Sequence, residues 1–259
     1  MAQSAPNTKA NRCGRTVSSS KQISLLKQNL PDWAALGSEN RTLLVAASVP
    51  RPNGGYWPQV SIEISLSSDG KLQAREHPAQ RWPEFCPQRH INDGGFFCLG
   101  LSDVPAVSSE DDAARWWRIL AAHLQMQFVA ELTKTWPKDM EWDHGEAGET
   151  QAIMEGIAQH HDLIDDVQDA HRYGQGWLSG ELPRLTKAGD RLVNGRAPCP
   201  KGCLRRKHPI LRRACRKRQA IYELVKLERL KRIQSAEFWK ACDGKTCCGQ
   251  MRSCPMRKD

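Results

Sequence analysis

Residues 89–101 read R-H-I-N-D-G-G-F-F-C-L-G-L. The N-D-G-G at 92–95 favours a tight turn, because glycine accepts positive φ and Asn or Asp side chains bond to the nearby backbone. We therefore expect the chain to reverse here and to run extended through residues 96–99. This places Cys98 at the edge of a loop, with His90 and Asn92 folded back toward it.

Cys98 is the candidate nucleophile of this loop. A thiol at a loop edge can be partly exposed and close to hydrogen-bond donors, as a nucleophile requires. The alternative is that Cys98 is a small buried hydrophobic residue, with His90 in the core and Asn92 merely in the turn. The spacing of His90, Asn92 and Cys98 taken together favours the interpretation of Cys98 as a nucleophile. Cys86 is the rival, although Phe85 and Pro87 beside it indicate a packed approach to the loop.

Hydrophobic patterning predicts an antiparallel meander before the loop. Short apolar runs, and runs in which apolar and polar residues alternate, are typical of strands. Such runs lie at residues 42–49, 60–66 and 71–76. A short helix that ends near Pro31 is expected within residues 20–36.

Helices are predicted after the loop. Ser109 and Asp112 form a capping-box pattern, and Trp116, Leu120 and Leu124 recur on one face of the helix that follows. A second helix is expected at 146–171. Helices packed on one face of an antiparallel sheet make an α+β fold.

Charge divides the chain in two. Residues 196–259 hold 19 Lys and Arg against 5 Asp and Glu, a balance of +14. The whole chain holds 38 against 29, which leaves 19 against 24, or −5, for residues 1–195. We expect a disordered segment at 1–20, a globular domain at 21–175, and a basic Cys-rich tail at 196–259 with an amphipathic helix at 219–240.

Seven of the 10 cysteines lie in the tail. No apolar run approaches the roughly 20 residues that span a bilayer, and the first residues lack the apolar core of a signal peptide. We therefore expect a cytoplasmic protein with reduced thiols and no membrane partner. Zinc prefers thiolate and imidazole ligands. The tail predicts either a zinc site or free thiols, with His208 and these candidate ligands: Cys199, Cys203, Cys215, Cys242, Cys247, Cys248 and Cys254.

The loop resembles the active-site core of ubiquitin-conjugating enzymes. There, a His-Pro-Asn triplet precedes a glycine turn and then the thioester-forming cysteine, which leucine follows. The matching residues here are His90, Asn92, Gly95, Cys98 and Leu99.

The surroundings of the loop extend this resemblance over about residues 42–145. Trp82-Pro83 is similar to the Tyr-Pro step that precedes the active-site flap in those enzymes. Ile91 replaces the central proline of the triplet, and the loop up to Cys98 is shorter than in the eukaryotic enzymes. These departures resemble divergent bacterial members, which occur beside ubiquitin-like proteins, activating enzymes and deconjugating peptidases, and which the resemblance associates with antiviral defence.

The resemblance implies a fold, a reaction and a set of partners. The fold would be the ubiquitin-conjugating α+β meander, with the catalytic domain at 21–175. Cys98 would carry a ubiquitin-like protein as a thioester, received from an activating enzyme, and pass it to an amine acceptor. Asn92 would donate to the oxyanion or hold the loop, and His90 would brace it. Asp103, or the pair Asp111 and Asp112, would position the amine. No cofactor is implied for catalysis.

A second function class stays open. The basic tail, including Arg205, Arg206, Lys207, Arg212 and Arg213, would neutralise phosphates of a nucleic acid. No aromatic platform or base-reading motif accompanies it, which argues against sequence-specific recognition. The alternative is therefore a nucleic-acid-binding or scaffold protein that acts through this tail.

Overall fold

A four-stranded antiparallel meander forms the base of the molecule. Its strands, in order, are β1 (Ala34–Leu36), β2 (Leu43–Ala47), β3 (Val60–Leu66) and β4 (Leu72–Glu76). β2–β4 confirm the three predicted strands. β1 was not predicted, because three residues are too few to show a period.

The computed structural model describes residues 19–37, 42–100, 106–193, 199, 204–205, 208–209, 211, 213–252 and 254–257.

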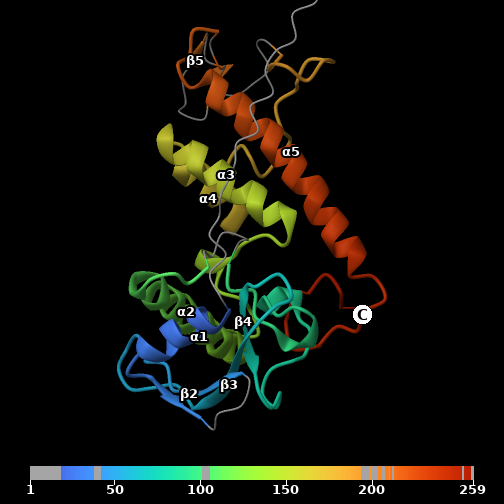
Figure 1. Ribbon diagram of the computed structural model, residues 1–259. Helices are drawn as coiled ribbons and strands as arrows, with labels where there is room; N and C mark the ends of the chain where they lie inside the picture. The colour runs from blue at the N-terminus through green and yellow to red at the C-terminus, as the bar shows by residue number, and fades with distance from the viewer. Residues whose placement is uncertain are drawn as a thin grey trace, which may run out of the picture.

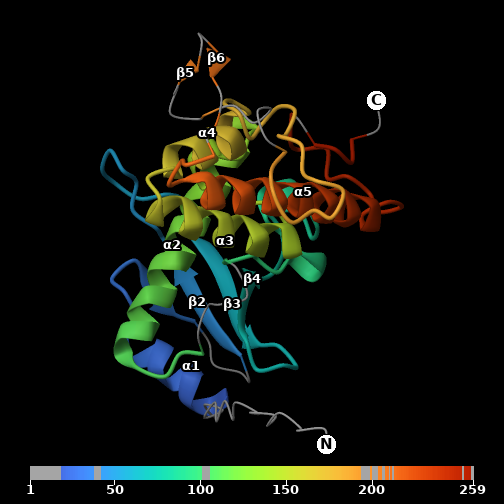
Figure 2. The same cartoon turned by 90° about the horizontal axis from the view of Figure 1, so that it is seen from above.

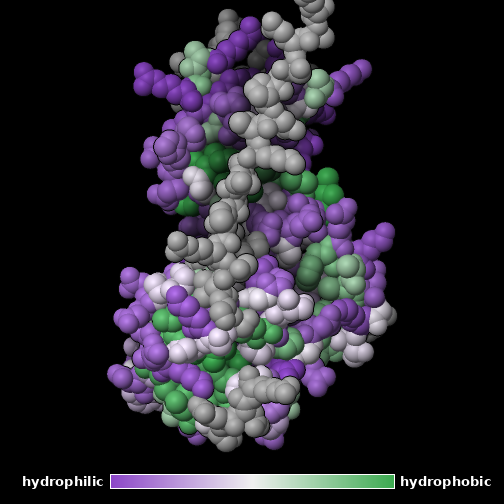
Figure 3. Space-filling view, in the orientation of Figure 1, coloured by the Kyte–Doolittle hydropathy of each residue, from purple (hydrophilic) through white to green (hydrophobic). Residues whose placement is uncertain are grey.

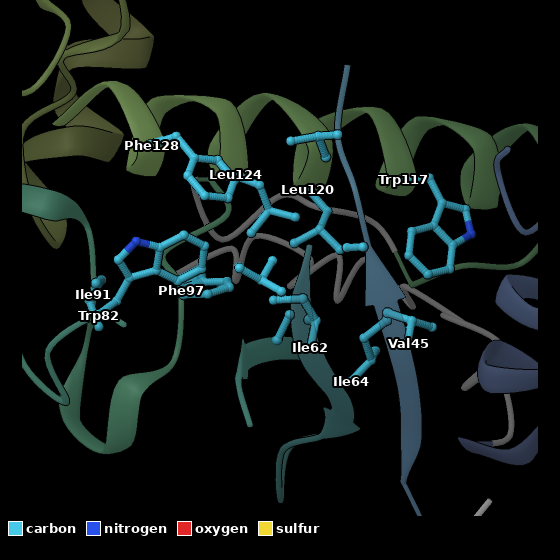
Figure 4. Close-up of a cluster of buried hydrophobic side chains, with 14 of the residues drawn as sticks. Val45, Ile62, Ile64, Trp82, Ile91, Phe97, Trp117, Leu120, Leu124 and Phe128 are labelled. Atoms are coloured by element: carbon cyan, nitrogen blue, oxygen red, sulfur yellow. The ribbon is translucent and has the colours of Figure 1, made fainter. Parts of the chain in front are cut away.

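Helix α2 (Glu110–Thr133) packs its apolar face on this sheet, as Figure 4 shows. It begins at Ser109, whose hydroxyl accepts from the backbone N–H of Asp112 in a reciprocal capping box, as predicted. Leu120 and Leu124 are fully buried against the strands. Helix α1 (Ser19–Gln28) completes the layer, and Trp117 Nε1 donates to the carbonyl of Leu26 at 3.1 Å. The predicted α+β fold class is confirmed.

A second helical unit lies beside the first. It contains α3 (Glu146–His160), α4 (Ile164–Tyr173) and α5 (Arg218–Ala241), and α3 lies along α5 in both views (Figure 1 and Figure 2). Helix α5 confirms the predicted basic helix. α3 and α4 pack on α5 in a separate core, although the predicted domain of 21–175 includes them. A short hairpin, β5 (Leu204–Arg205) and β6 (His208–Pro209), precedes α5.

The single helix predicted at 146–171 is wrong. The chain breaks between α3 and α4, where Asp162 has φ 50° and the N–H of Leu163 donates to the carbonyl of Ala158 at 2.8 Å. The break lets α4 turn back along α3, so that Leu163 and Val167 are buried in one core with α5. Burial of both helices against α5 outweighs continuation of the helix.

The segment after α5 returns to the first unit. Met251 and Cys254 are buried in the same core as the sheet and α2. The N–H of Arg252 donates to the carbonyl of Lys134, just beyond the end of α2, at 2.9 Å. Figure 1 shows this red segment beside the loops that follow β4. The Cys-rich tail is therefore split between the two units.

One face of the molecule is largely polar. Figure 3 shows hydrophilic side chains over most of this face of both units. Among the described helices, none has the length and apolar character needed to cross a membrane.

Leu120→Ala should destabilise the first unit. The side chain is fully buried between α2 and the sheet, so its removal leaves a cavity that costs about 2–5 kcal/mol of unfolding free energy. Urea unfolding measures the change. Leu132→Ala on the same helix is the control, because Leu132 is 70% exposed. Equal losses in both variants would contradict this packing.

Candidate functional site

A short hairpin between residues 86 and 98 carries the candidate site. Cys86 and Ile91 pair through two backbone bonds of 3.0 Å around the turn η1 (Pro87–Arg89). The second turn, η2 (Asp93–Gly95), has positive φ at Gly94 and Gly95, as the glycines predict. Beyond it the N–H of Cys98 donates to the carbonyl of His90 at 2.8 Å. The predicted reversal is confirmed.

The pairing sorts the hairpin's side chains onto two faces. Ile91 pairs with Phe97, and both are buried in the first core. Side chains alternate across a strand, so His90 and Cys98 fall on the opposite face. Both line the same cavity of about 420 Å³. The structure therefore brings these two predicted residues together.

The cavity beside Cys98 is built by both units. Its walls are mainly apolar and include Ile119 and Met126 of α2, with Trp136 and Trp142 from the connection to α3. Glu149 also lines it, as does Asp143, whose carboxylate accepts from Lys231 and Ser235. Sequence reasoning missed these wall residues, because their place depends on long-range packing and no local motif marks them.

Cys98 is partly exposed. Burial raises the pKa of its thiol, and a hydrogen bond from the backbone N–H of Gly100 opposes that rise in part. The free thiol is therefore protonated at neutral pH. Cys86, the rival nucleophile, is only 2% exposed, and its sulfur lies 3.1 Å from that of Cys248. Of the two thiols, Cys98 is the one that faces the cavity.

His90 is fixed by packing. It has φ 52°, is 8% exposed, and its ring lies 5.0 Å from that of Trp136 and 4.8 Å from that of His144. Burial first, and then the neighbouring His144 and His123, lower its pKa well below the usual value. The imidazole is neutral at pH 7. This geometry fits a bracing role better than proton transfer.

Asn92 occupies a different place from the other two residues. Its N–H donates to the carbonyl of Phe96 at 2.7 Å, which closes the turn. The side chain is exposed, makes no capping bond to η2 and is not among the residues that line the Cys98 cavity. The predicted amide donor thus stands free at the turn, two residues from His90.

The two predicted acidic residues that the structure describes, Asp111 and Asp112, are not brought to the cysteine. Asp103 lies outside the described residues. The Asp112 carboxylate accepts from the backbone N–H of Ser108 and Ser109 at 3.1 Å, as part of the capping box. Asp111 is an exposed first-turn residue of α2 that does not line the cavity.

The predicted zinc ligands that the structure describes fall at different places along the two units. Cys215 packs against the second core, whereas Cys247, Cys248 and Cys254 pack in the first, and Cys242 is buried just after α5. Cys199 is buried, while Cys203 and the side chain of His208 fall outside the described part. In that part, no group of three or more His, Cys, Asp or Glu residues could hold a metal. A zinc site stays a prediction.

The nucleic-acid alternative also stays a prediction. The Arg206, Lys207 and Arg212 positions lie outside the described residues, as does the Arg205 side chain. Among those described, Arg213 and Arg216 are exposed ahead of α5. The sequence predicted no aromatic residues beside these arginines on which bases of a nucleic acid could stack.

His123 forms the floor of the cavity. It is 3% exposed, and its Nε2 lies 2.9 Å from the Nε2 of Gln127. The amide nitrogen is a donor, so His123 accepts through Nε2 and carries its proton on Nδ1. Burial, followed by the charge of Arg89, lowers the pKa of His123 to about 3.

Two family models match consecutive parts of this chain. Residues 33–138 match the model described as "Prokaryotic E2 domain", and residues 143–256 match "Cysteine-rich domain, C-terminal to E2 domain". The gap between the matches, residues 139–142, begins within η3 (Lys138–Met140) and ends ahead of α3. Neither the curated proteins nor the solved structures gave a significant match. The two matches fit a bacterial E2-like protein.

Acid should destabilise the protein through His123. The unfolded histidine binds a proton below about pH 6.5, while the folded one does not until about pH 3. Stability is therefore lost as pH falls below 6.5, by about 2 kcal/mol from this residue between pH 7 and 5. His90 and His144, whose pKa values burial also lowers, act in the same direction.

Urea unfolding of His123→Phe at both pH values measures this contribution. The variant should lose about 2 kcal/mol less than the wild type on acidification. The exposed His160, changed to Gln, is the control and should keep the wild-type dependence. An unchanged dependence in His123→Phe would show that this histidine is not held neutral.

Proposed function

We propose that this chain, in which a prokaryotic E2 domain precedes a Cys-rich domain, carries a ubiquitin-like protein as a thioester on Cys98 and transfers it to an amine. The E2 domain by itself indicates a ubiquitin-like conjugating enzyme in general, with an activating enzyme as partner. The observation that carries the finer proposal is Cys98 opposite His90 on one hairpin face, at the wall of the cavity.

Charging is a thioester exchange. The Cys98 sulfur, after loss of its proton, attacks the carbonyl carbon at the C-terminus of the modifier, which the activating enzyme presents. A tetrahedral intermediate forms, and the activating-enzyme thiolate leaves and takes up a proton. Because the raised pKa of Cys98 keeps the free thiol protonated, it resists side reactions until the partner docks.

Transfer consumes the thioester. A neutral amine attacks the same carbonyl carbon, an amide bond forms, and the Cys98 sulfur leaves and is protonated. In this proposal the exposed amide of Asn92 donates to the developing oxyanion, which requires the side chain to turn toward the thioester, because it does not line the Cys98 cavity. Asp143 and Glu149 line the cavity and can accept hydrogen bonds from the incoming amine. No cofactor is required.

Charging of Cys98 tests the proposal directly. The protein, a cognate activating enzyme, a ubiquitin-like protein and ATP should give a band that reductant removes. Cys98→Ala should lack the band, and Cys98→Ser should give a reductant-resistant oxygen ester. Cys86→Ser is the control and should still charge. Charging by Cys98→Ala but not by Cys86→Ser would move the site to Cys86, and no charging at all would defeat the conjugating function.

Asn92→Ala should slow discharge to an amine more than charging. Loss of one oxyanion donor costs about 2–4 kcal/mol, or about 30-fold or more in rate. Asn92→Asp separates the two roles of the residue, because aspartate can keep the turn but lacks the amide donor. Single-turnover discharge to free lysine is the measurement. Recovery of the rate in Asn92→Asp would assign Asn92 to loop structure.

A further inference from the structure

Two cysteines that are far apart in the sequence meet at the base of the hairpin that carries the candidate site. The sulfur of Cys86, at the base of the hairpin, lies 3.1 Å from the sulfur of Cys248 in the returning tail. Cys86 is 2% exposed, and Cys248 is partly exposed. The two residues are 162 positions apart in sequence, so only the return of the tail brings them together.

Hydrogen bonds and an ion pair that do not involve sulfur hold the segments around Cys86 and Cys248 in place. Arg89 is fully buried, and its guanidinium donates to Oε1 of Gln250 at 2.6 Å, two residues after Cys248. The same guanidinium donates to Oε1 of Gln127 at 2.9 Å, which fixes it on α2. Three residues before Cys248, Lys245 Nζ donates to Oδ2 of Asp93 in the hairpin at 2.5 Å. The backbone around both sulfurs is therefore anchored before any bond forms between them.

We propose that Cys248 and Cys86 form a reversible disulfide when hydrogen peroxide or a related oxidant reaches Cys248. The bond would fasten the Cys-rich tail to the hairpin that carries Cys98. A metal does not account for the pair on this structure, since in the described residues no third ligand joins them in a group that could hold one.

The chemistry balances in two steps. The Cys248 sulfur, the more accessible of the two, attacks one oxygen of hydrogen peroxide as a thiolate; a sulfenic acid forms, and hydroxide leaves and is protonated to water. The Cys86 sulfur then attacks the Cys248 sulfur, the S–S bond forms, and the sulfenic oxygen leaves as a second water. The two sulfurs lose two electrons in total, which reduce the peroxide.

The neighbouring cysteines are placed differently. Cys247 adjoins Cys248 in sequence, but its sulfur accepts from the backbone N–H of Gly249 at 3.4 Å and shares a hydrogen bond with the thiol of Cys254. Cys98 lies on the opposite face of the hairpin from the core, at the cavity. The disulfide would therefore leave Cys98 free, while it ties down Cys86 and so the backbone that pairs with Ile91.

Peptide mapping of the full-length protein tests the inference. The reduced protein is treated with one equivalent of hydrogen peroxide at pH 7, blocked with iodoacetamide and digested with trypsin. We expect peptide 82–89 joined to peptide 246–252, with fragmentation that places the bond on Cys248, and loss of the joined peptide after reductant. Cys248→Ser should abolish it, whereas Cys247→Ser, the matched control, should retain it.

A second variant keeps the test decisive if Cys248→Ser folds poorly. In Cys86→Ser the sulfenic acid on Cys248 loses the thiol that lies 3.1 Å away. With Cys254 also changed to Ser, because that thiol interacts with Cys248 as well, dimedone should label Cys248 several-fold more than in the wild type. A joined peptide that survives in Cys248→Ser would overturn the proposal. So would preferential oxidation of Cys98, or stoichiometric zinc in the reduced protein that Cys248→Ser removes.

Discussion

The buried guanidinium of Arg89 is the constraint on which this arrangement depends. A cation removed from water must have its donors satisfied, since each unpaired buried donor costs more than a hydrogen bond contributes. Arg89 donates to the side chain and the carbonyl of Gln127 in α2 and to the side chain of Gln250 in the tail. The hairpin, the core helix and the returning tail therefore have to adopt their places together.

The shape of the candidate site depends on this arrangement. His90 follows Arg89 directly, and its ring packs against Trp136 and His144. The His144 ring in turn lies 4.8 Å from Phe238 near the end of α5. A continuous set of rings thus connects the hairpin to the second unit, and the cavity beside Cys98 has walls from both. The Cys-rich domain is part of the surroundings of the cysteine rather than a remote appendage.

The separation of the tail cysteines follows from the two cores. Cys215 lies ahead of α5 and packs with the second core, while the cysteines after α5 reach the first. Helix α5 has 24 residues, and at 1.5 Å per residue it spans about 36 Å. Ligands before and after such a helix cannot share one tetrahedral metal, so a zinc site in the tail would have to take its ligands from one end of α5.

The sequence by itself determined the meander, the capped helix α2, the turn at 92–95 and the hairpin position of Cys98 and His90. Each of these depends on local signals: alternation, a capping box, or glycines with positive φ. It did not show the break before Leu163, the return of the tail to the first core, or the Cys86–Cys248 pair. Tertiary structure alone decided these, because burial against distant residues sets them, and no local pattern records which distant surface a segment will cover.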